Sequence, residues 1–567
     1  MNDPWTRFNT VALVCLIAFA TACQERGSGA GSGMWGSSQP EPNAALQSLV
    51  TGNTLGTLVA GPQTPAPERT RLVDQLRRVY KDQNYQLIWT KGDRPSNRYR
   101  EFAKALETAA HHGLPAEHYK VAMDDQSGSG VKISPEQAPE LDVKTTASFL
   151  RYFAHLSGGR LDPRALQSLW TLKPEKPDLV VALTTALKNN DLPATMDRLQ
   201  PQHPEYRELQ KALVRYREIA AKGGWPSIPA RTRLKPNQQS NVVPALRQRL
   251  AIEGDLDPAH EKDPSPIFDA NVVEAVKRFE ERHRIEPDGI VDPATVSALN
   301  VPVEQRIRII ELNLERWRWL PDPMPARHFV VNVPDFRLEA IENGKAVIGM
   351  RVVVGEPDNK TPIFADEMTH VVFSPYWNVP PGIAQEETIP RVLNDPGFLA
   401  RNNMEVVGPS GAVVDASSVD WSNAKGLRIR QRPGSGNALG GVKFIFPNNF
   451  DVYLHDTNAT KLFDRIERGL SHGCVRVEEP HKLAQYVLRD QPEWTPEAID
   501  AAMKSGNEKH VKLNTPIPVY ILYKTAWVHE GGVRFLKDLY GHDADQASKL
   551  WPGETKGGGT GGLETRR

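Results

Sequence analysis

The spacing of the apolar residues changes at His328, and this change limits what the chain can fold into. Before it, apolar residues recur every three or four positions, which is the period of an amphipathic helix. After it they alternate with polar residues, as in Phe329, Val331 and Val333, which is the period of a strand with one buried face. The dipeptide Asn343-Gly344 separates two such runs and favours a tight hairpin turn. We therefore expect an α+β multidomain protein, helical first and β-rich afterwards.

The helical part divides into two units. Residues 69–225 hold long amphipathic segments and are expected to form a helical scaffold domain, in which no group of polar side chains suggests chemistry. Residues 234–300 are more compact, with two amphipathic helices, a turn at Asp288-Gly289 and a short third helix. The alternative for this second unit is a plain helical spacer. We predict no metal site, because the histidines are scattered and lack ligand spacing.

Both ends of the chain have the composition of signals and linkers. The apolar run that ends at Ala22 is too short to span a bilayer but suits a secretory signal, so residues 1–22 are assigned to a signal peptide. The residues before Cys23 resemble a bacterial lipobox, and we expect Cys23 to carry a lipid; the alternative is an ordinary cleavage that leaves it free. Residues 23–68 and 552–567 are rich in glycine and other small residues, which predicts a disordered tether and a disordered tail.

The overall composition excludes one class of partner and draws attention to one thiol. The 567 residues give room for about three domains. Their 69 basic and 69 acidic side chains leave no net charge, which argues against a nucleic-acid partner. Cys474 is the one cysteine outside the N-terminal region, so the body has no disulfide scaffold. An unpaired thiol is costly to keep in an oxidising compartment, and we interpret Cys474 as chemically reactive.

Cys474 and His455 have the arrangement of a cysteine nucleophile and its base. Alternation along residues 451–455 places Tyr453 and His455 on one face of a strand, where they are expected to line a cleft. A nearby imidazole lowers the pKa of a cysteine by pairing thiolate with imidazolium. The other ring nitrogen of His455 would be oriented by a carbonyl or carboxylate, such as the backbone of Asp456. The alternative for Cys474 is an inert buried thiol.

The residues beside Cys474 are expected to receive the reacting carbonyl. Gly473 has no side chain and would leave the backbone N–H groups of residues 472–474 free to bind an oxyanion. A stretch of helical and loop character at about 381–431 interrupts the strands and is expected to cover the site as a lid.

Two neighbouring residues have structural alternatives. His472 could shape the turn without touching substrate. Arg476 could bind substrate, or it could clamp a loop through the carboxylate of Glu478 or Glu479.

These motifs resemble a known enzyme family. His455, followed after an interval by Ser-His-Gly-Cys-Val-Arg at 471–476, resembles the signature of the L,D-transpeptidases with a YkuD-type catalytic domain. Three further stretches resemble a larger periplasmic branch of that family: Tyr376-Trp377-Asn378-Val379-Pro380, Asn437-Ala438-Leu439-Gly440 and Phe446-Pro447-Asn448. That branch carries a scaffold, a peptidoglycan-binding module and a capping subdomain. The segment 234–300 is similar to the three-helix peptidoglycan-binding domain through Ala275-Val276-Lys277-Arg278-Phe279 and Asp288-Gly289.

The resemblance implies domain bounds and residue roles. The β-rich L,D-transpeptidase catalytic domain would cover 326–525, with the capping insertion at about 381–431, and a C-terminal extension at 526–551 would return to the scaffold. Cys474 would be the nucleophile and His455 the general base and acid. The remaining residues would serve the oxyanion and positioning (Ser471, His472, Gly473) or bind substrate (Tyr453, Trp377, Asn437, Arg476).

The resemblance further implies acyl transfer on peptidoglycan without a cofactor. Cys474 would attack the diaminopimelate carbonyl of a tetrapeptide donor stem, D-alanine would leave, and the diaminopimelate amine of an acceptor stem would resolve the thioester into a 3-3 cross-link. Carbapenems would acylate the same thiol. The partners would be these stem peptides and, through residues 234–300, glycan strands. We expect a periplasmic protein, an outer-membrane lipoprotein of a Gram-negative bacterium that meets the membrane only through a lipid on Cys23.

Three other functions stay open at this point. The same fold could use water as acceptor, as an L,D-carboxypeptidase or amidase, or it could join a lipoprotein to the wall. A function of another class is a non-catalytic lipoprotein that anchors the outer membrane to the wall through residues 234–300.

Overall fold

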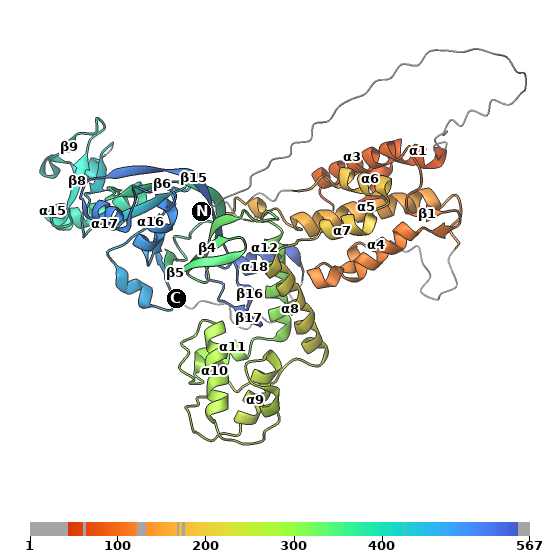
Figure 1. Ribbon diagram of the computed structural model, residues 1–567, viewed down its shortest axis with the longest axis horizontal. Helices are drawn as coiled ribbons and strands as arrows, with labels where there is room; N and C mark the ends of the chain where they lie inside the picture. The colour runs from red at the N-terminus through yellow and green to blue at the C-terminus, as the bar shows by residue number, and fades with distance from the viewer. Residues whose placement is uncertain are drawn as a thin grey trace, which may run out of the picture. The chain divides into compact units, whose positions relative to one another are not determined.

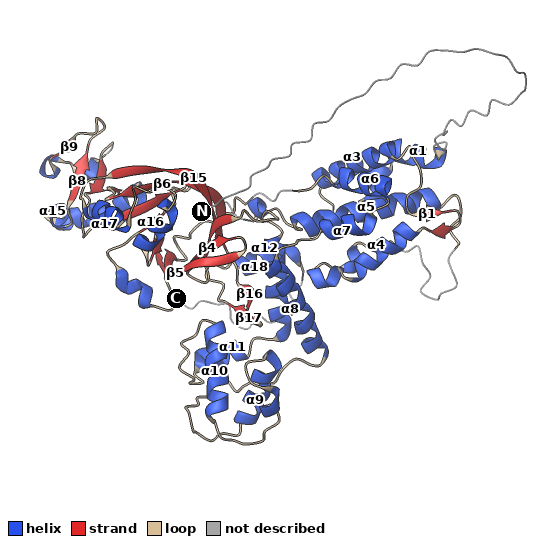
Figure 2. Ribbon diagram, viewed as in Figure 1, coloured by secondary structure: helices blue, strands red, loops and turns tan. Residues whose placement is uncertain are grey.

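The computed structural model describes residues 43–60, 64–121, 132–166, 169–172, 176–424 and 426–553 (Figure 1). The predictions of a signal peptide and of lipidation at Cys23 lie outside these residues, as does nearly all of the predicted tail. Figure 2 shows helices over the first half of the chain and strands over most of the second, as the change of period at His328 predicts.

The first unit is a helical domain built around α5 (Ala138–Gly158), whose Phe149 and Phe153 are fully buried. Its polar centre is Asp142, which accepts hydrogen bonds from the Tyr80 hydroxyl and from the backbone N–H of Trp89. The other regular elements are α1 (Ala44–Thr51), α2 (Leu55–Val59), α3 (Ala66–Asp82), β1 (Thr90–Lys91), β2 (Arg94–Pro95), α4 (Asn97–Glu107), α6 (Leu179–Asn189), α7 (Leu192–Arg198) and α8 (Pro204–Ala221).

The predicted disordered tether at 23–68 is wrong in its second half. Helices α1 and α2 and the start of α3 lie there, and Leu46 and Val50 of α1 are fully buried in the core of the helical domain. Asn43 caps α1 by accepting the N–H of Leu46. Leu46 and Val50 are four residues apart, which is one helical turn, but surrounding glycines, serines and prolines conceal this short signal.

Residues 239–299 form a small three-helix unit with its own core, made by α9 (Val243–Glu253), α10 (Ala270–Arg282) and α11 (Pro293–Leu299). It also holds a buried ionic cluster, in which Arg282 contacts Glu253 at 2.8 Å and Asp255 at 2.6 Å. The same guanidinium donates to the carbonyl of Val533 in the C-terminal hairpin, at 2.9 Å.

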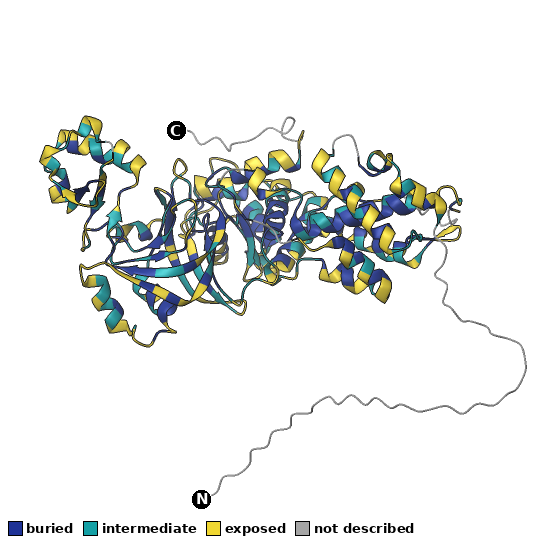
Figure 3. Cartoon of the chain, turned by 90° about the horizontal axis from the view of Figure 1, so that it is seen from above, coloured by how far each residue is buried: buried dark blue, intermediate teal, exposed yellow. Residues whose placement is uncertain are grey.

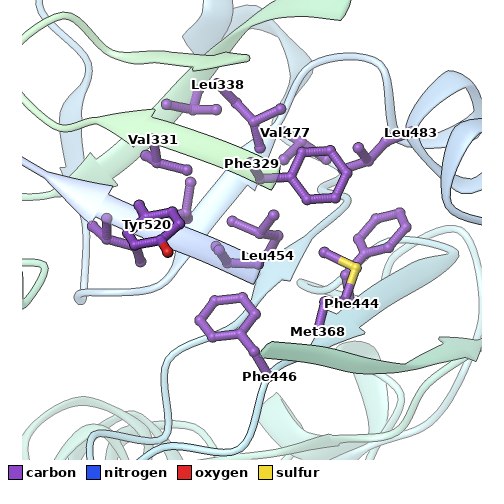
Figure 4. Packing of buried hydrophobic residues seen from close by; sticks show 14 of the residues in the cluster. Phe329, Val331, Leu338, Met368, Phe444, Phe446, Leu454, Val477, Leu483 and Tyr520 are labelled. Carbon is purple, nitrogen blue, oxygen red and sulfur yellow. The ribbon is translucent and has the colours of Figure 1, made fainter. Parts of the chain in front are cut away.

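The β-rich domain is a single closed sheet. The nine strands follow the order β13-β5-β14-β12-β11-β6-β15-β3-β4, and β4 pairs again with β5, so the sheet returns on itself. Apolar side chains from facing strands fill its interior (Figure 4). The strands are β3 (Arg327–Asn332), β4 (Arg337–Glu342), β5 (Lys345–Gly355), β6 (Phe364–Phe373), β11 (Val442–Ile445), β12 (Leu454–His455), β13 (Gly469–Ser471), β14 (Val475–Val477) and β15 (Lys509–Leu522).

The hairpin predicted from Asn343-Gly344 is confirmed. Both residues have positive φ, 49° and 78°, and they join β4 to β5 with Glu342 paired to Lys345. Helices α16 (Pro480–Leu488) and α17 (Pro496–Lys504) contribute Leu483 and Ile499 to the core of the sheet.

The capping insertion has a sheet and a core of its own, where we expected helix and loop. Its strands β7 (Trp377–Asn378), β8 (Met404–Val407), β9 (Val413–Val414) and β10 (Arg428–Gln431) lie in the order β7-β10-β8-β9. Strands of two to four residues give too few alternations to be recognised in the sequence. Its helices are α13 (Pro381–Ile383), the π-helix η5 (Ala384–Thr388), α14 (Ile389–Asn394) and α15 (Phe398–Arg401).

After β15 the chain packs against two helices that precede the closed sheet, α8 and α12 (Val303–Trp317). Strands β16 (Ala526–His529) and β17 (Gly532–Phe535) share a buried apolar cluster with them, and Gln546 of α18 (His542–Leu550) donates to the carbonyl of Leu312. Figure 3 shows the distribution of buried and exposed residues over the chain. In the part of the chain that the structure describes, none of the helices is long and apolar enough to cross a bilayer.

Candidate active site

Strands β12 and β14 bring four of the predicted polar residues together. The two strands are parallel neighbours, with Leu454 paired to Val475 and His455 to Arg476. Leu454 and Val475 are fully buried in the core of the sheet. Side chains alternate along a strand, so the residues on either side of this apolar pair share the opposite face. They are Tyr453, His455, Cys474 and Arg476.

His455 is buried, with 4% of its surface exposed, and its ring orientation is fixed. Nδ1 lies 2.5 Å from the carbonyl oxygen of Asp456, as the sequence analysis expects. A carbonyl only accepts, so Nδ1 carries the proton and Nε2 is left as an acceptor. Burial, and next the charge of Arg476, lower the pKa of His455 to about 3. His455 is therefore neutral and able to take a proton.

The loop after His455 is anchored by the carboxylate of Asp456. This carboxylate accepts the N–H of Gly441 at 2.7 Å and the N–H of Thr457 at 2.7 Å. Gly440 has φ of +59°, and a Cβ there would lie 2.2 Å from the Asp456 carboxylate. This close approach explains why the last residue of the Asn437–Gly440 motif is glycine, and it gives the Asp456 carboxylate a role in positioning the loop.

The Cys474 residue is partly exposed, and its thiol has two polar contacts. Its Sγ is 3.8 Å from the carbonyl oxygen of Asp451, and it shares a hydrogen bond with the Tyr453 side chain. Burial raises the pKa of Cys474, and the opposing effects of Tyr453 and Arg476 do not cancel that rise. Burial therefore opposes the expected thiolate–imidazolium pair, because it disfavours the charged form of both the thiol and the imidazole of His455.

The turn that carries Cys474 is held from inside the domain. Gly473 has φ of +109°, a conformation that favours glycine. Ser471 Oγ donates to the carbonyl of Cys474 at 2.6 Å and accepts the Gly473 N–H at 3.2 Å. The predicted free amides are thus wrong for Gly473, whose N–H is occupied, and stay a prediction for the N–H groups of residues 472 and 474.

A second support comes from residues that the sequence analysis missed. Thr361 Oγ1 donates to the carbonyl of Gly473 at 2.8 Å and accepts the N–H of Gly355 at 2.8 Å. The Tyr540 hydroxyl donates to the carbonyl of Gly355 at 2.6 Å and accepts the N–H of Thr361 at 3.1 Å. These contacts connect the C-terminal extension to the cysteine turn, and no local sequence motif predicts them.

Comparison with protein families identifies this domain. Residues 326–519 match the family described as "L,D-transpeptidase catalytic domain". They form an L,D-transpeptidase catalytic domain. Residues 74–213 match a "Scaffold domain" and residues 239–299 a "Putative peptidoglycan binding domain". The family resemblance and the α+β fold class that the sequence predicts are confirmed.

A curated relative and several solved structures are similar to parts of the chain. A "Putative L,D-transpeptidase" of Haemophilus influenzae is 34% identical over 237 residues, which are 41% of this chain and 48% of that protein. The chain thus matches about half the length of this relative. A Mycobacterium smegmatis L,D-transpeptidase structure is 12% identical, with 35% of this chain and 58% of that one covered, at a TM-score of 0.17. The L,D-transpeptidase structure (residues 123–326) from Xylanimonas cellulosilytica is 15% identical, with 52% and 98% covered, at 0.17.

Within the transpeptidase domain, Arg476 is not a loop clamp. Glu478 accepts from Arg351 at 2.8 Å, and Glu479 pairs with Lys482 at 2.9 Å, so both predicted partners are engaged elsewhere. The Nε of Arg476 is buried and has no hydrogen-bond partner among the described residues. Its charge acts on both Cys474 and His455, which leaves substrate binding as the prediction for Arg476.

His472 is turned toward the capping insertion. Its Nε2 lies 2.7 Å from Oε1 of Glu387 in η5, and the other oxygen of Glu387 is 3.2 Å from Arg391. The His472 and Glu387 side chains are 42% and 35% exposed. The sequence analysis missed Glu387, which lies 85 residues before His472 in a segment without a motif.

The side chains of Trp377 and Asn437 both contact other parts of the protein. Trp377 is half-buried against the apolar core of the insertion. The Asn437 side chain is 1% exposed and donates to the carbonyls of Pro375 at 3.1 Å and Arg432 at 2.9 Å. The predicted substrate-binding role of Asn437 disagrees with this arrangement, because its amide is already occupied in holding the end of the insertion. The described segments bring no three His, Cys, Asp or Glu side chains together in a way that could hold a metal ion.

Proposed function

We propose that this protein is an L,D-transpeptidase that forms 3-3 cross-links in peptidoglycan through a thioester on Cys474. The observation that carries the proposal is the common face of β12 and β14, which places Tyr453, His455, Cys474 and Arg476 together inside a transpeptidase domain. The neighbouring peptidoglycan-binding family match at 239–299 supports the choice of substrate.

Burial of the thiol and of the imidazole favours their neutral forms, and this suits a proton transfer that accompanies attack. The Cys474 proton moves to Nε2 of His455 as Sγ bonds to the diaminopimelate carbonyl of a donor tetrapeptide. N–H groups of the cysteine turn and the Arg476 guanidinium stabilise the charge that develops on the carbonyl oxygen. The bond to D-alanine then breaks, and its nitrogen receives the proton from His455.

The second half-reaction reverses these roles. The side-chain amine of diaminopimelate on an acceptor stem attacks the thioester and gives its proton to His455. The C–S bond breaks, and the thiolate of Cys474 recovers the proton. The energy of the original peptide bond is kept in the thioester, so the reaction needs no cofactor. Water in place of the amine would make the same site an L,D-carboxypeptidase, and a lipoprotein lysine would attach that protein to the wall.

The location of the protein is part of the same proposal. A peptidoglycan substrate requires export, and the apolar leader with Cys23 is consistent with a periplasmic, lipid-anchored protein at the outer membrane. Glycan strands would be bound through residues 239–299. Carbapenems would acylate Cys474, because they present a strained carbonyl to the same nucleophile.

The test is incubation of the full chain with tetrapeptide muropeptides, read by mass spectrometry beside Cys474→Ala. A dimer that has lost one D-alanine, absent with the variant, is the expected result. If the only product is a tripeptide monomer, the acceptor is water and the protein is a hydrolase. Unchanged substrate with both proteins would contradict an enzymatic role and favour a wall anchor.

A further inference from the structure

The capping insertion carries one irregular helical turn, and that turn faces the cysteine motif. The helical stretch from Pro381 to Asn394 changes to a π-helix over η5. Such turns have poorer packing than an α-helix and are frequent at functional sites, because the extra residue redirects a side chain. In η5 Thr388 is buried, whereas the next residue upstream, Glu387, is half-exposed and reaches His472.

The hydrogen bond between Glu387 and His472 connects two separately built parts. The insertion has its own apolar core, distinct from the core of the closed sheet. Among the described residues, this is the one side-chain hydrogen bond between the insertion at 381–431 and the cysteine motif at 471–476. A carboxylate only accepts hydrogen bonds, so Nε2 of His472 carries a proton and the ring is held in one orientation. Arg391, one turn further along, contacts the second oxygen of Glu387.

His472 contacts a different part of the protein from the two other residues that hold the cysteine turn. Ser471 and Thr361 fix the two peptides that flank Cys474 from the interior of the domain. The outer side of the same turn is held by His472, whose partner belongs to the insertion. The outer support therefore depends on where the insertion lies relative to the turn.

We propose that Glu387 is a positioning residue for the transpeptidase reaction, acting through His472. Closure of the insertion then completes the geometry of the cysteine turn, so that the thiol reacts fastest with the donor stem covered. This inference rests on the proposed function for its substrate, but the contact itself is independent of what the acceptor is.

The contact can be removed without unfolding the protein, because half-exposed pairs contribute little to stability. The full chain would be compared with Glu387→Ala, Glu387→Gln, His472→Ala and the double variant Glu387→Ala/His472→Ala. Glu386→Ala is the matched control, since Glu386 is exposed in the same turn. Two rates would be measured: cross-link formation from tetrapeptide muropeptides, and alkylation of Cys474 by iodoacetamide, read by intact mass.

The expected results distinguish positioning from a merely structural role. Glu387→Ala lowers kcat on the order of tenfold with little change in KM, because small displacements of a reacting group have effects of this size or larger. Glu387→Gln, which keeps an acceptor, recovers part of the rate, and Glu386→Ala behaves as wild type. The double variant is no slower than His472→Ala, as expected if Glu387 acts only through His472.

Two results would overturn the inference: a Glu387→Ala rate equal to wild type in both assays, or additive losses in the double variant. If the wild-type protein forms no product from muropeptides, the proposed function fails. The alkylation rates then still decide the inference, because an unchanged rate in Glu387→Ala means that the contact does not position the thiol.

Discussion

The two sides of the cysteine turn are supported by different kinds of contact. On the inner side, Thr361 is fully buried and binds the Gly473 carbonyl, and Tyr540 in turn braces Thr361. On the outer side, His472 contacts Glu387 across a half-exposed pair supplied by the insertion. Buried hydrogen bonds are costly to lose, whereas exposed ionic contacts form and break easily. The inner support thus provides a permanent framework, and the outer one depends on the position of a separate subdomain.

The largest effect should appear in the pH dependence of Cys474 alkylation, which tests whether burial keeps the thiol protonated. Burial raises the pKa of Cys474, so the thiolate fraction is small at neutral pH. The rate of alkylation should therefore rise about tenfold for each pH unit between pH 6 and pH 8, since only the thiolate reacts. The measurement is iodoacetamide labelling followed by intact mass, with Cys474→Ala to subtract other reactions.

A thiolate–imidazolium pair would give a different profile, nearly flat across the same range.

His455 adds a second check, because its pKa is lowered to about 3. Below pH 6.5 the unfolded chain binds a proton at this residue that the folded chain refuses, so burial of His455 lowers stability as the pH falls toward 3. His455→Gln should therefore reduce the acid sensitivity of folding, measured by urea unfolding at pH 4 and pH 7.

The next effect should come from breaking the inner support at Thr361. Thr361→Val keeps the shape but removes the hydroxyl that serves the Gly473 carbonyl and the Gly355 N–H. Leaving two buried backbone groups unpaired should lower the free energy of unfolding by about 1–3 kcal/mol. Cross-linking should slow on the order of tenfold to a hundredfold, since the cysteine turn loses its position. Urea denaturation and product formation measure the two effects.

Thr361→Ser is the matched control, because it keeps the hydroxyl and removes only a methyl group. It should retain most of the activity. Equal losses in the two variants would mean that packing of the methyl group, and not the hydrogen bonds, supports the turn.

A smaller effect is expected one step further from the cysteine, at Tyr540. Tyr540→Phe removes the hydroxyl that links the Gly355 carbonyl to the Thr361 N–H, while the ring remains in place. The hydroxyl makes two hydrogen bonds that each contribute about 1 kcal/mol, so the free energy of unfolding should fall by about 1–2 kcal/mol. The melting temperature and the rate of Cys474 alkylation would both be measured. A variant with a lowered melting temperature and an unchanged alkylation rate would show that Tyr540 stabilises the extension without supporting the turn.

The inner and outer supports also differ in how far the sequence predicts them. The positions of His455 and Cys474 are predictable because His455 lies in a short strand with its own alternation and Cys474 directly precedes another, within a motif. Thr361, Tyr540 and Glu387 are not, because each reaches the turn through the closure of the sheet or the folding of the insertion. Local patterns report periodicity and motifs, whereas these contacts join residues far apart in the chain.

The same limit explains two of the differences between the expectations and the structure. Helix α1 was hidden because its two buried residues, Leu46 and Val50, lie within a glycine- and serine-rich stretch. The thiolate–imidazolium pair was expected from the residue types alone, but their burial favours the neutral forms. The residue types predict which groups react, whereas their burial and the neighbouring charges determine their protonation state before the reaction.

The smallest effect should come from Arg391, which contacts the second oxygen of Glu387 and not His472. Both side chains are partly exposed, and an i,i+4 pair of this kind contributes about 0.3–0.5 kcal/mol. Arg391→Ala should therefore leave the melting temperature within error and slow cross-linking by at most about threefold. A loss as large as that of Glu387→Ala would mean that the insertion is oriented by the arginine, and that the outer support is a network and not a single contact. A rate equal to wild type would place the whole outer support in the one hydrogen bond to His472.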